Sequence, residues 1–308
     1  MKTVADHPLL HEALSKLTLG SPRSFRGVGV VPLLWFNASE PDWLTSDEAV
    51  ASGALEVTEV NEAGSVPALR VANRGDRAVF LLDSEELAGA RQNRILNTSV
   101  LIAAGQTITI PVSCVEQWRW AYRSRAFTAA RRSLYASVRR KKAVQVHESL
   151  RMRRGHAADQ GEIWADLESR AQAYNVQSPT GAMGDVFESR GRDLEDYARA
   201  LPPEPGQAGA IVYLGSDWVA LELLPGPTLF KKAWARLLPG YAIEALLSSP
   251  EGSPEKSPAK RLKALLRAPL ECFPAVGVGE DYRFQAGDFL GAALVAEDRL
   301  AHLMAFPV

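Results

Sequence analysis

Two carboxylates, Glu86 and Glu116, are the side chains of this 308-residue chain that most suggest chemistry. Hydrolysis at an anomeric carbon uses such a pair, with an acid and a base on either side of the bond that breaks. Glu85 and Glu86 are adjacent, so in a strand they point to opposite faces, and we expect Glu86 to share the face of Leu82. The ordinary alternatives are a solvated carboxylate or turn cap for Glu86, and a pair with Arg119 for Glu116. Both residues are candidates for acid–base catalysis or ribose binding.

A run of amide and guanidinium groups lies between them: Gln92, Asn93, Arg94 and Asn97. Such groups are suited to ribose hydroxyls, phosphates and the edge of an adenine ring. The competing interpretation is a turn whose amides bond to the backbone, a common use of asparagine. The first interpretation predicts that the run orients a ligand and that Arg119 contacts a phosphate.

The two cysteines, Cys114 and Cys272, are too far apart in sequence for a C-x-x-C motif, and they do not resemble a secreted disulfide framework. Cys114 follows the β-like run ITIPVS. We expect it to be structural rather than nucleophilic, because no histidine lies near it in the sequence. The five histidines are scattered, and the Gly-x-Gly segments lack the rest of a dinucleotide fingerprint. We therefore expect no metal site and no resident cofactor.

Basic side chains are concentrated in residues 119–154, although the whole chain has a formal charge of only −1. Twelve lysines and arginines occur there, and Glu148 is the only acid. A helix with a solvated basic face is one interpretation, and a surface that binds phosphate or nucleic acid is the other.

Membrane and secretion signals are missing from the sequence pattern. No apolar run approaches the roughly 20 residues that span a bilayer. The start, MKTVADHPLLHEALSKL, has acids and histidines where a signal peptide needs a continuous apolar stretch. We expect a cytoplasmic protein.

The order of the expected elements predicts an α+β fold. Short β-rich runs separated by Gly64 and by the turn at 73–76 are typical of an antiparallel meander. We expect strands at 25–37, 55–60, 66–73, 77–86, 94–103, 106–113, 210–215 and 218–224, and helices at 9–19, 43–52, 124–150, 160–174, 178–201, 228–247 (broken at Pro239) and 259–268. Further β-rich runs follow to the end of the chain. The predicted architecture is an antiparallel β-meander sheet with a central helical segment and C-terminal strands that rejoin the sheet.

The length allows one large domain or two modest ones. We expect an N-terminal helix or arm at residues 1–24 and a single α+β domain at 25–308. Residues 248–258, SSPEGSPEKSP, are rich in proline, serine and charge, and this composition predicts a mobile loop.

The most distinctive sequence lies within residues 80–120, FLLDSEELAGARQNRILNTSVLIAAG followed by IPVSCVEQWRW. It resembles a prokaryotic domain of unknown function, the ADP-ribosylglycohydrolase- and rhodanese-phosphatase-superfamily-associated protein domain. Residues 206–212, 229–246 and 291–306 resemble the same family, so the resemblance covers roughly residues 25–306. By genomic context it implies a link to NAD and ADP-ribose metabolism.

Two residues depart from the family's pattern. Ser84 and Trp118 stand where the family often has glycine. We expect the bulky Trp118 to narrow any pocket near Cys114 and Glu116.

These features predict a small-molecule site on an α+β scaffold that binds, and in one version hydrolyses, an ADP-ribose- or nucleotide-like ligand. Glu86 and Glu116 would be the catalytic or ribose-binding carboxylates, and the ligand-binding residues would be Gln92, Asn93, Arg94, Asn97 and Arg119. The alternative is a non-enzymatic interaction module that docks a protein or nucleic acid through residues 119–154. A third hypothesis is a thiol-dependent enzyme centred on Cys114.

Overall fold

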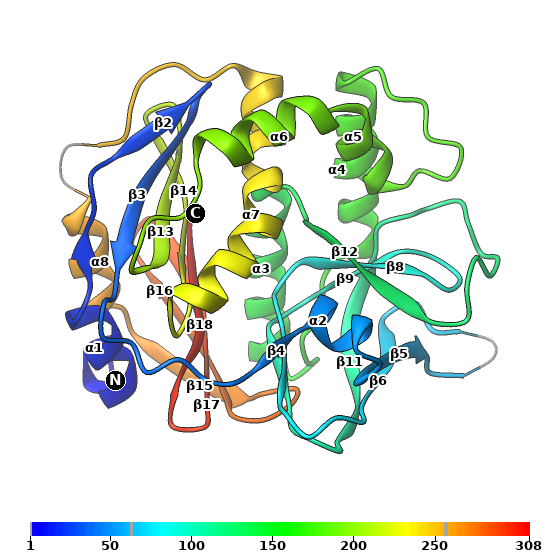
Figure 1. Cartoon of the computed structure of the whole chain (residues 1–308), viewed down its shortest axis with the longest axis horizontal. Coiled ribbons are helices and arrows are strands. Elements are labelled where there is room, and N and C mark those ends of the chain that lie inside the picture. Colours follow the sequence, from blue (N-terminus) through cyan, green and yellow to red (C-terminus); the bar gives the residue numbers. More distant parts are fainter. Residues whose placement is uncertain (1, 62–63, 256–257) are drawn as a thin grey trace. The chain divides into compact units, whose positions relative to one another are not determined.

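Strands and helices follow one another in blocks along the chain, and the computed structural model is an α+β protein, as predicted (Figure 1). The structure describes residues 2–61, 64–255 and 258–308. One compact unit is made of residues 1–41, 196–275 and 279–308, and the other of residues 42–195 and 276–278. The single domain at 25–308 stays a prediction. The loop expected at 248–258 includes residues 256–257, which lie outside the described residues.

The first unit is built on a large antiparallel sheet with the strand order β1-β3-β13-β14-β18-β17-β16-β15, in which β2 also pairs with β3. Its strands are β1 (Thr18–Leu19), β2 (Arg23–Phe25), β3 (Val28–Leu34), β13 (Gln207–Leu214), β14 (Asp217–Leu223), β15 (Leu270–Pro274), β16 (Glu280–Ala286), β17 (Phe289–Ala296) and β18 (Arg299–Pro307). Every residue of β17 is buried, as expected for a strand covered on both faces. The C-terminal strands therefore join the sheet that begins with the first long strand of the chain.

The helices of this unit are η1 (Val4–Asp6), α1 (Pro8–Ser15), α7 (Pro227–Ser248) and α8 (Ala259–Leu266), while α6 (Gly191–Ala200) has residues in both units. The long α7, yellow in Figure 1, packs against β13. The predicted break at Pro239 is wrong, because the helix continues through that residue. Its neighbours Leu237, Leu238 and Tyr241 are buried, and their packing offsets the hydrogen bond that proline removes.

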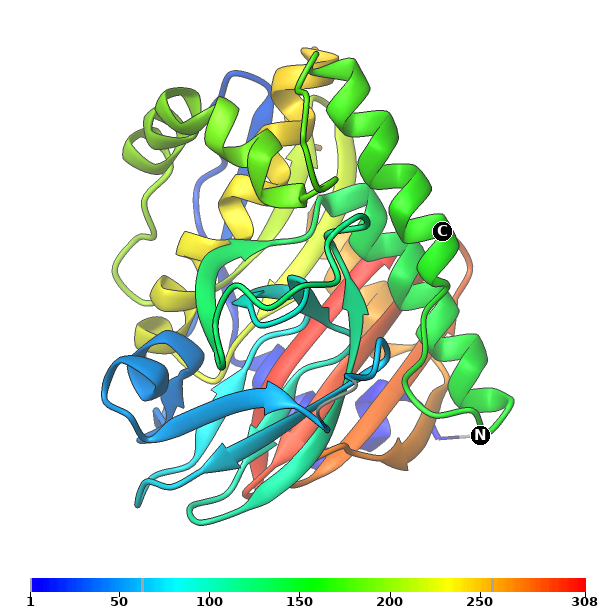
Figure 2. The same ribbon diagram turned by 90° about the vertical axis from the view of Figure 1, so that its right-hand side faces the viewer.

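The second unit contains two smaller sheets. Six antiparallel strands follow the order β12-β8-β9-β11-β6-β5, and three strands follow the order β10-β7-β4. The strands are β4 (Leu44–Thr45), β5 (Leu55–Glu59), β6 (Ala68–Asn73), β7 (Val79–Leu81), β8 (Glu85–Gly89), β9 (Arg94–Leu96), β10 (Val100–Ile102), β11 (Thr107–Cys114) and β12 (Phe127–Ser133). Figure 2 shows the long strands of this unit curving together. Alternate residues of β5 and β6 face its core, among them Val57 and Val71.

The helices of the second unit are α2 (Ser46–Ala51), α3 (Ala136–Arg151), α4 (Gln160–Ala173) and α5 (Met183–Ser189). The helix predicted at 124–150 is too long, because residues 127–133 form β12, which pairs with β8. Arginine and alanine favour a helix only weakly, and pairing with a sheet edge outweighs that preference. The helix predicted at 178–201 is divided into α5 and α6 at Arg190. Within the described ranges, no helix has the length and apolar character that crossing a bilayer requires.

Candidate functional site

Asn93 links the two carboxylates that the sequence singles out. Its side-chain Nδ2 donates to Glu86 Oε1 at 2.9 Å, and its backbone N–H donates to Glu116 Oε2 at 3.1 Å. This meeting follows from strand pairing, because β8 pairs with β9 and β9 pairs with β11. The structure thus brings Glu86, Asn93 and Glu116 together.

Two arginines neutralise these carboxylates. Arg119 Nε donates to Glu116 Oε1 at 2.8 Å, and Arg119 Nη2 donates to Oε2 at 2.6 Å. Arg132 Nε donates to Glu86 Oε2 at 2.5 Å. Glu86 is 1% exposed and Glu116 is 0% exposed. These four residues and Asn93 form a buried group of mutually bonded side chains, called the Asn93 network below.

Arg132 is the member of the network that the sequence does not reveal. It lies in β12, where the pairing with β8 shifts register between Ala129 and Ser133 and Arg131 has a φ of 56°. Such a bulge redirects the next side chain. The Arg132 guanidinium also lies against Gly184, where a Cβ would collide with Arg132 Nη2. The sequence predicts a helix at 124–150, so the pairing of β12 with β8 is not expected from it. Without that pairing, Arg132 cannot be recognised as a partner of Glu86.

Burial and pairing move the pKa values of the two carboxyls in opposite directions. Burial raises the pKa of Glu86, and Arg132 offsets the effect only in part. Burial also opposes ionisation of Glu116, but hydrogen bonds from Arg119, Thr180 and the Asn93 amide hold its pKa below the usual value. Divergent pKa values are typical of an acid–base pair. Catalysis also requires that the carboxyl groups contact a substrate. Glu86 and Glu116 are buried and paired with arginines, and this arrangement opposes such contact.

Arg94 is held within the same region by Gln92. Gln92 Oε1 accepts from Arg94 Nη1 at 3.2 Å and from Cys114 Sγ at 2.9 Å. Arg94 is 0% exposed, and burial lowers its pKa. Its Nε and Nη2 have no hydrogen-bond partner among the residues that the structure describes; Glu59 Oε1 lies 4.0 Å from Nη2. Arg94 is therefore enclosed by protein rather than presented to solvent.

Cys114 is the buried cysteine and Cys272 the exposed one. Burial raises the pKa of Cys114 to about 11, and the nearby Arg94 offsets this only in part. The thiolate is the reactive form, so burial and the raised pKa both disfavour a nucleophilic role for Cys114. Burial also raises the pKa of Cys272, but its side chain is exposed. A thiol-reactive disulfide reagent is therefore expected to modify Cys272 first in the folded protein and Cys114 only after denaturation. Fast labelling of Cys114 in the folded protein, located by peptide mass spectrometry, would contradict this.

Asn97 makes its hydrogen bonds outside the Asn93 network. Its Nδ2 donates to the carbonyl of His156 at 2.9 Å, and its Oδ1 accepts from Ser113 at 2.8 Å. Its carbonyl accepts from Lys142 Nζ at 2.9 Å. Lys142 also bonds to Asp83, and both side chains are buried. Asn97 therefore belongs with a separate buried ion pair, Asp83–Lys142.

The basic run at 119–154 is not one continuous solvated face. Arg119, Arg132, Arg139 and Lys142 all pair with acids, and the side chain least buried among the four is 17% exposed. Lys141 pairs with Asp166 at the surface. Four of the twelve cations of this run thus neutralise acids inside the protein, and most of the others are exposed.

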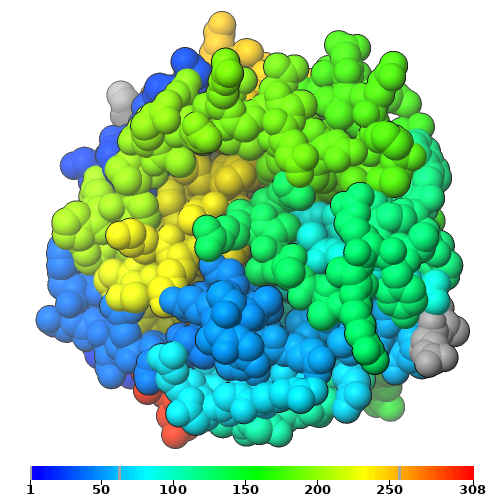
Figure 3. Space-filling view, turned by 45° about the vertical axis from the view of Figure 1, so that its right-hand side comes forward, coloured from blue at the N-terminus to red at the C-terminus, as the bar shows by residue number. Residues whose placement is uncertain are grey.

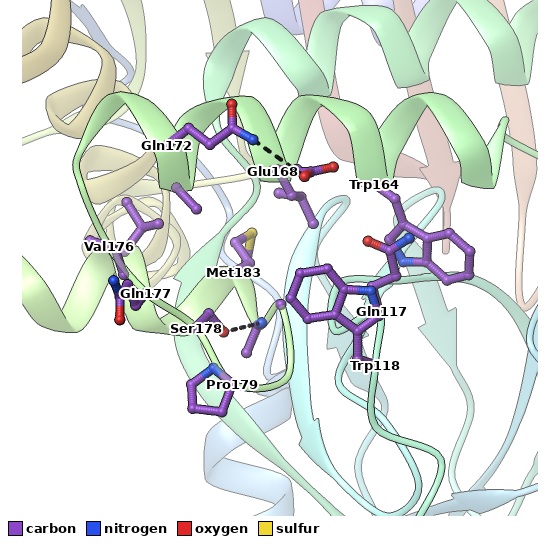
Figure 4. Close-up of a pocket in the computed structure, with 15 residues that line it drawn as sticks. Gln117, Trp118, Trp164, Glu168, Gln172, Val176, Gln177, Ser178, Pro179 and Met183 are labelled. Atoms are coloured by element: carbon purple, nitrogen blue, oxygen red, sulfur yellow. Dashed lines mark hydrogen bonds between the residues drawn. The ribbon is translucent and has the colours of Figure 1, made fainter.

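One cavity of the second unit has two indoles in its lining and is called the tryptophan cavity (Figure 4). Its volume is about 530 Å³. Its lining residues are Gln117, Trp118, Trp164, Leu167, Glu168, Ala171, Gln172, Val176, Gln177, Ser178, Pro179, Gly181, Ala182, Met183 and Val186. Trp164, Glu168 and Gln172 are four residues apart along α4 and so share one face of that helix. The sequence predicts a helix at 160–174 but gives no sign that Trp164 lines a cavity.

A second depression, called the arginine groove, is larger and more polar. Its volume is about 1060 Å³, and its lining residues are Glu56, Thr58, Glu59, Asn61, Arg70, Arg91, Tyr122, Arg123, Ser124 and Arg125. The Arg91 guanidinium lies 4.4 Å from the centre of the Tyr122 ring. In Figure 3, bluish-green atoms of the part of the chain near residue 120 lie at the surface, and Tyr122 is 50% exposed. The groove combines positive charge with an accessible aromatic ring.

The Asn93 network holds the chain segments that carry this groove. Arg119 Nη1 donates to the carbonyls of Ala90 at 2.6 Å and Ala121 at 2.8 Å. These residues directly precede Arg91 and Tyr122. The backbone N–H of Arg123 donates to the same Ala90 carbonyl at 2.9 Å. The network thus holds two loop segments of the groove wall, although its own carboxylates do not line the groove.

The structure defines an α+β protein in which buried ion pairs lie close to two surface depressions. Residues 16–306 match the model of the ARG and Rhodanese-Phosphatase-superfamily-associated Protein domain, and the chain belongs to this family. No curated protein and no solved structure matches the chain. Among the described residues, no three histidine, cysteine, aspartate or glutamate side chains are grouped so that they could hold a metal ion.

Proposed function

We propose that the protein binds a phosphorylated, nucleotide-like ligand of the ADP-ribose type in the arginine groove. The observation that carries this proposal is the gathering of Arg70, Arg91, Arg123 and Arg125 around one depression. Guanidinium groups bind phosphate oxygens through charge-assisted, often bidentate hydrogen bonds. The association with ADP-ribosylglycohydrolases in the family's name is consistent with this ligand class.

The other lining groups suit the rest of such a ligand. The carboxylates of Glu56 and Glu59 can accept hydrogen bonds from ribose hydroxyls. Tyr122 offers a ring on which a base can stack, an interaction worth about 1–3 kcal/mol in other proteins. Glu86 and Glu116 act in this proposal as supports, because they hold Asn93 and Arg119 in place. The proposal is one of binding and includes no turnover.

The charge distribution favours a small ligand in the arginine groove over a nucleic acid or protein docked along residues 119–154. A docking module at 119–154 would lack four of the run's twelve cations, because Arg119, Arg132, Arg139 and Lys142 are paired with acids inside the protein. Among the exposed arginines of the run, Arg123 and Arg125 line the arginine groove, and Arg154 lines a separate pocket. The grouping of Arg123 and Arg125 with Arg70 and Arg91 in one depression favours a small anionic ligand over an extended nucleic acid.

Titration calorimetry with ADP-ribose, AMP, pyrophosphate and free ribose tests this proposal. We expect the phosphorylated compounds to bind and ribose alone not to bind. The double variant Arg123→Ala/Arg125→Ala is expected to weaken ADP-ribose binding by about tenfold or more, since a hydrogen bond to a charged group contributes about 1.5–3 kcal/mol. Affinity should fall as salt rises, because exposed charges are screened.

Arg192→Ala is the matched control, because Arg192 is an exposed arginine outside the groove. It should bind ADP-ribose as the unaltered protein does. Equal losses in the control and the double variant, or no heat with any phosphorylated compound at millimolar concentration, would contradict the proposal. Tight binding of a single-stranded oligonucleotide without binding of the small compounds would favour the docking module instead.

A further inference from the structure

The tryptophan cavity has a chemical character opposite to that of the arginine groove. Its lining includes the carboxylate Glu168 and the amides of Gln117, Gln172 and Gln177, and among the lining residues described there is no lysine, arginine or histidine. A phosphate group would find no charged partner there. The cavity therefore selects a different class of ligand.

Two indoles, those of Trp118 and Trp164, form part of the wall of this cavity. Trp118 is 60% exposed. Its backbone is nevertheless held in place, because its N–H donates to the carbonyl of Thr180 at 2.9 Å. The carbonyl of Gln117 accepts from Gln92 Nε2 at 3.2 Å. Figure 4 shows Trp118 and Trp164 together at one side of the cavity, across from Val176 and Gln177. A large exposed indole on a fixed backbone is a ready surface for ligand binding.

The charges around the cavity favour a cation. Glu168 lies on the same helical face as Trp164 and bonds to Gln172 at 3.3 Å. Ala171 and Gln172, in the last turn of the 14-residue α4, line the cavity, and the C-terminal end of a helix carries partial negative charge. The short α5 begins at Met183 on another part of the wall, but the amide of Met183 is already bonded to the carbonyl of Val115.

We propose that the tryptophan cavity binds an organic cation, such as a quaternary or protonated amine with an apolar body. The indole faces attract the cation through their negative quadrupole, and indole is the strongest of the side-chain rings in this respect. Glu168 supplies the opposite charge. The apolar residues Leu167, Pro179 and Met183 accept the apolar body of the ligand. The volume of about 530 Å³ lies within the range of known small-molecule sites.

Calorimetry with choline, benzyltrimethylammonium and the neutral carbon analogue of choline tests this site. We expect the two cations to bind and the neutral analogue, which has the same shape, to bind about tenfold more weakly or worse. Trp118→Ala should reduce affinity for the cations by about tenfold, and Trp118→Phe by less, because it keeps an aromatic face. Equal affinity for choline and its neutral analogue, or no binding of either cation, would overturn the proposal.

Two glutamate-to-glutamine variants test whether the charge of Glu168 contributes to cation binding. Glu168→Gln should weaken cation binding, whereas Glu162→Gln, on the same helix but outside the cavity lining, should not. Cation binding that is unchanged in both Trp118→Ala and Glu168→Gln would place the ligand elsewhere. The Arg123→Ala/Arg125→Ala variant should bind choline normally, so this result is independent of whether the arginine groove binds ADP-ribose.

Discussion

Arg119→Met is expected to lower the free energy of unfolding by about 3–5 kcal/mol, the usual cost of removing one partner from a buried ion pair. The substitution leaves Glu116, which is 0% exposed, without its bidentate partner. It also removes donors from the carbonyls of Ala90 and Ala121. Few single changes in this protein should destabilise it as strongly.

Arg123→Ala is the appropriate comparison, because Arg123 belongs to the same segment but is exposed. Urea unfolding followed by circular dichroism should show a change of no more than about 0.5 kcal/mol for it, as is usual for surface substitutions. A loss below about 1 kcal/mol for Arg119→Met would mean that the Asn93 network contributes little to stability. Glu116→Gln offers a second view of the same pair, since it keeps the side-chain shape and removes the charge.

The parts of the fold that sequence analysis predicts well are those with local signals. The expected strands at 55–60 and 66–73 correspond to β5 and β6, whose alternation of inward and outward residues is visible in the sequence. Ser84 stands where the family often has glycine, and its φ of 64° lies in the left-handed region that favours glycine. In contrast, β12 forms because it pairs with β8, and the sequence of residues 127–133 does not indicate that this pairing will occur.

Some features of the candidate site can likewise be predicted from the sequence, and others depend on tertiary packing. The sequence singles out Glu86, Asn93 and Glu116 by residue type, and the pairing of β8, β9 and β11 brings these three together. Their burial follows from arginines that arrive from other elements, and a sequence does not reveal which cation will neutralise which acid. The tryptophan cavity likewise needs Trp118 and Trp164, which come from a loop and a helix far apart in sequence. Surface shape of this kind arises only from tertiary packing.

Lys142→Met is expected to destabilise the protein by about 3 kcal/mol or more, whereas Lys141→Met, its neighbour on α3, should cost about 1 kcal/mol at most. Both lysines bond to an aspartate, at 2.5 Å for Lys142 with Asp83 and at 2.7 Å for Lys141 with Asp166. The difference is burial, since the Lys142 side chain is 0% exposed and that of Lys141 is 48% exposed. Desolvation makes the loss of a buried partner costly, while solvent compensates for the loss at the surface.

The same pair predicts a dependence of stability on pH. Burial alone would raise the pKa of Asp83, but Lys142 and Arg139 outweigh it and hold the pKa below the usual value. A carboxyl whose folded pKa is lowered contributes stability above its unfolded pKa of about 4, and this contribution is lost as pH falls through the folded pKa. Urea titrations between neutral pH and the acid range should therefore show a smaller acid-induced loss in Lys142→Met than in the unaltered protein or in Lys141→Met. Parallel pH profiles for all three proteins would show that the Asp83–Lys142 pair does not govern acid stability.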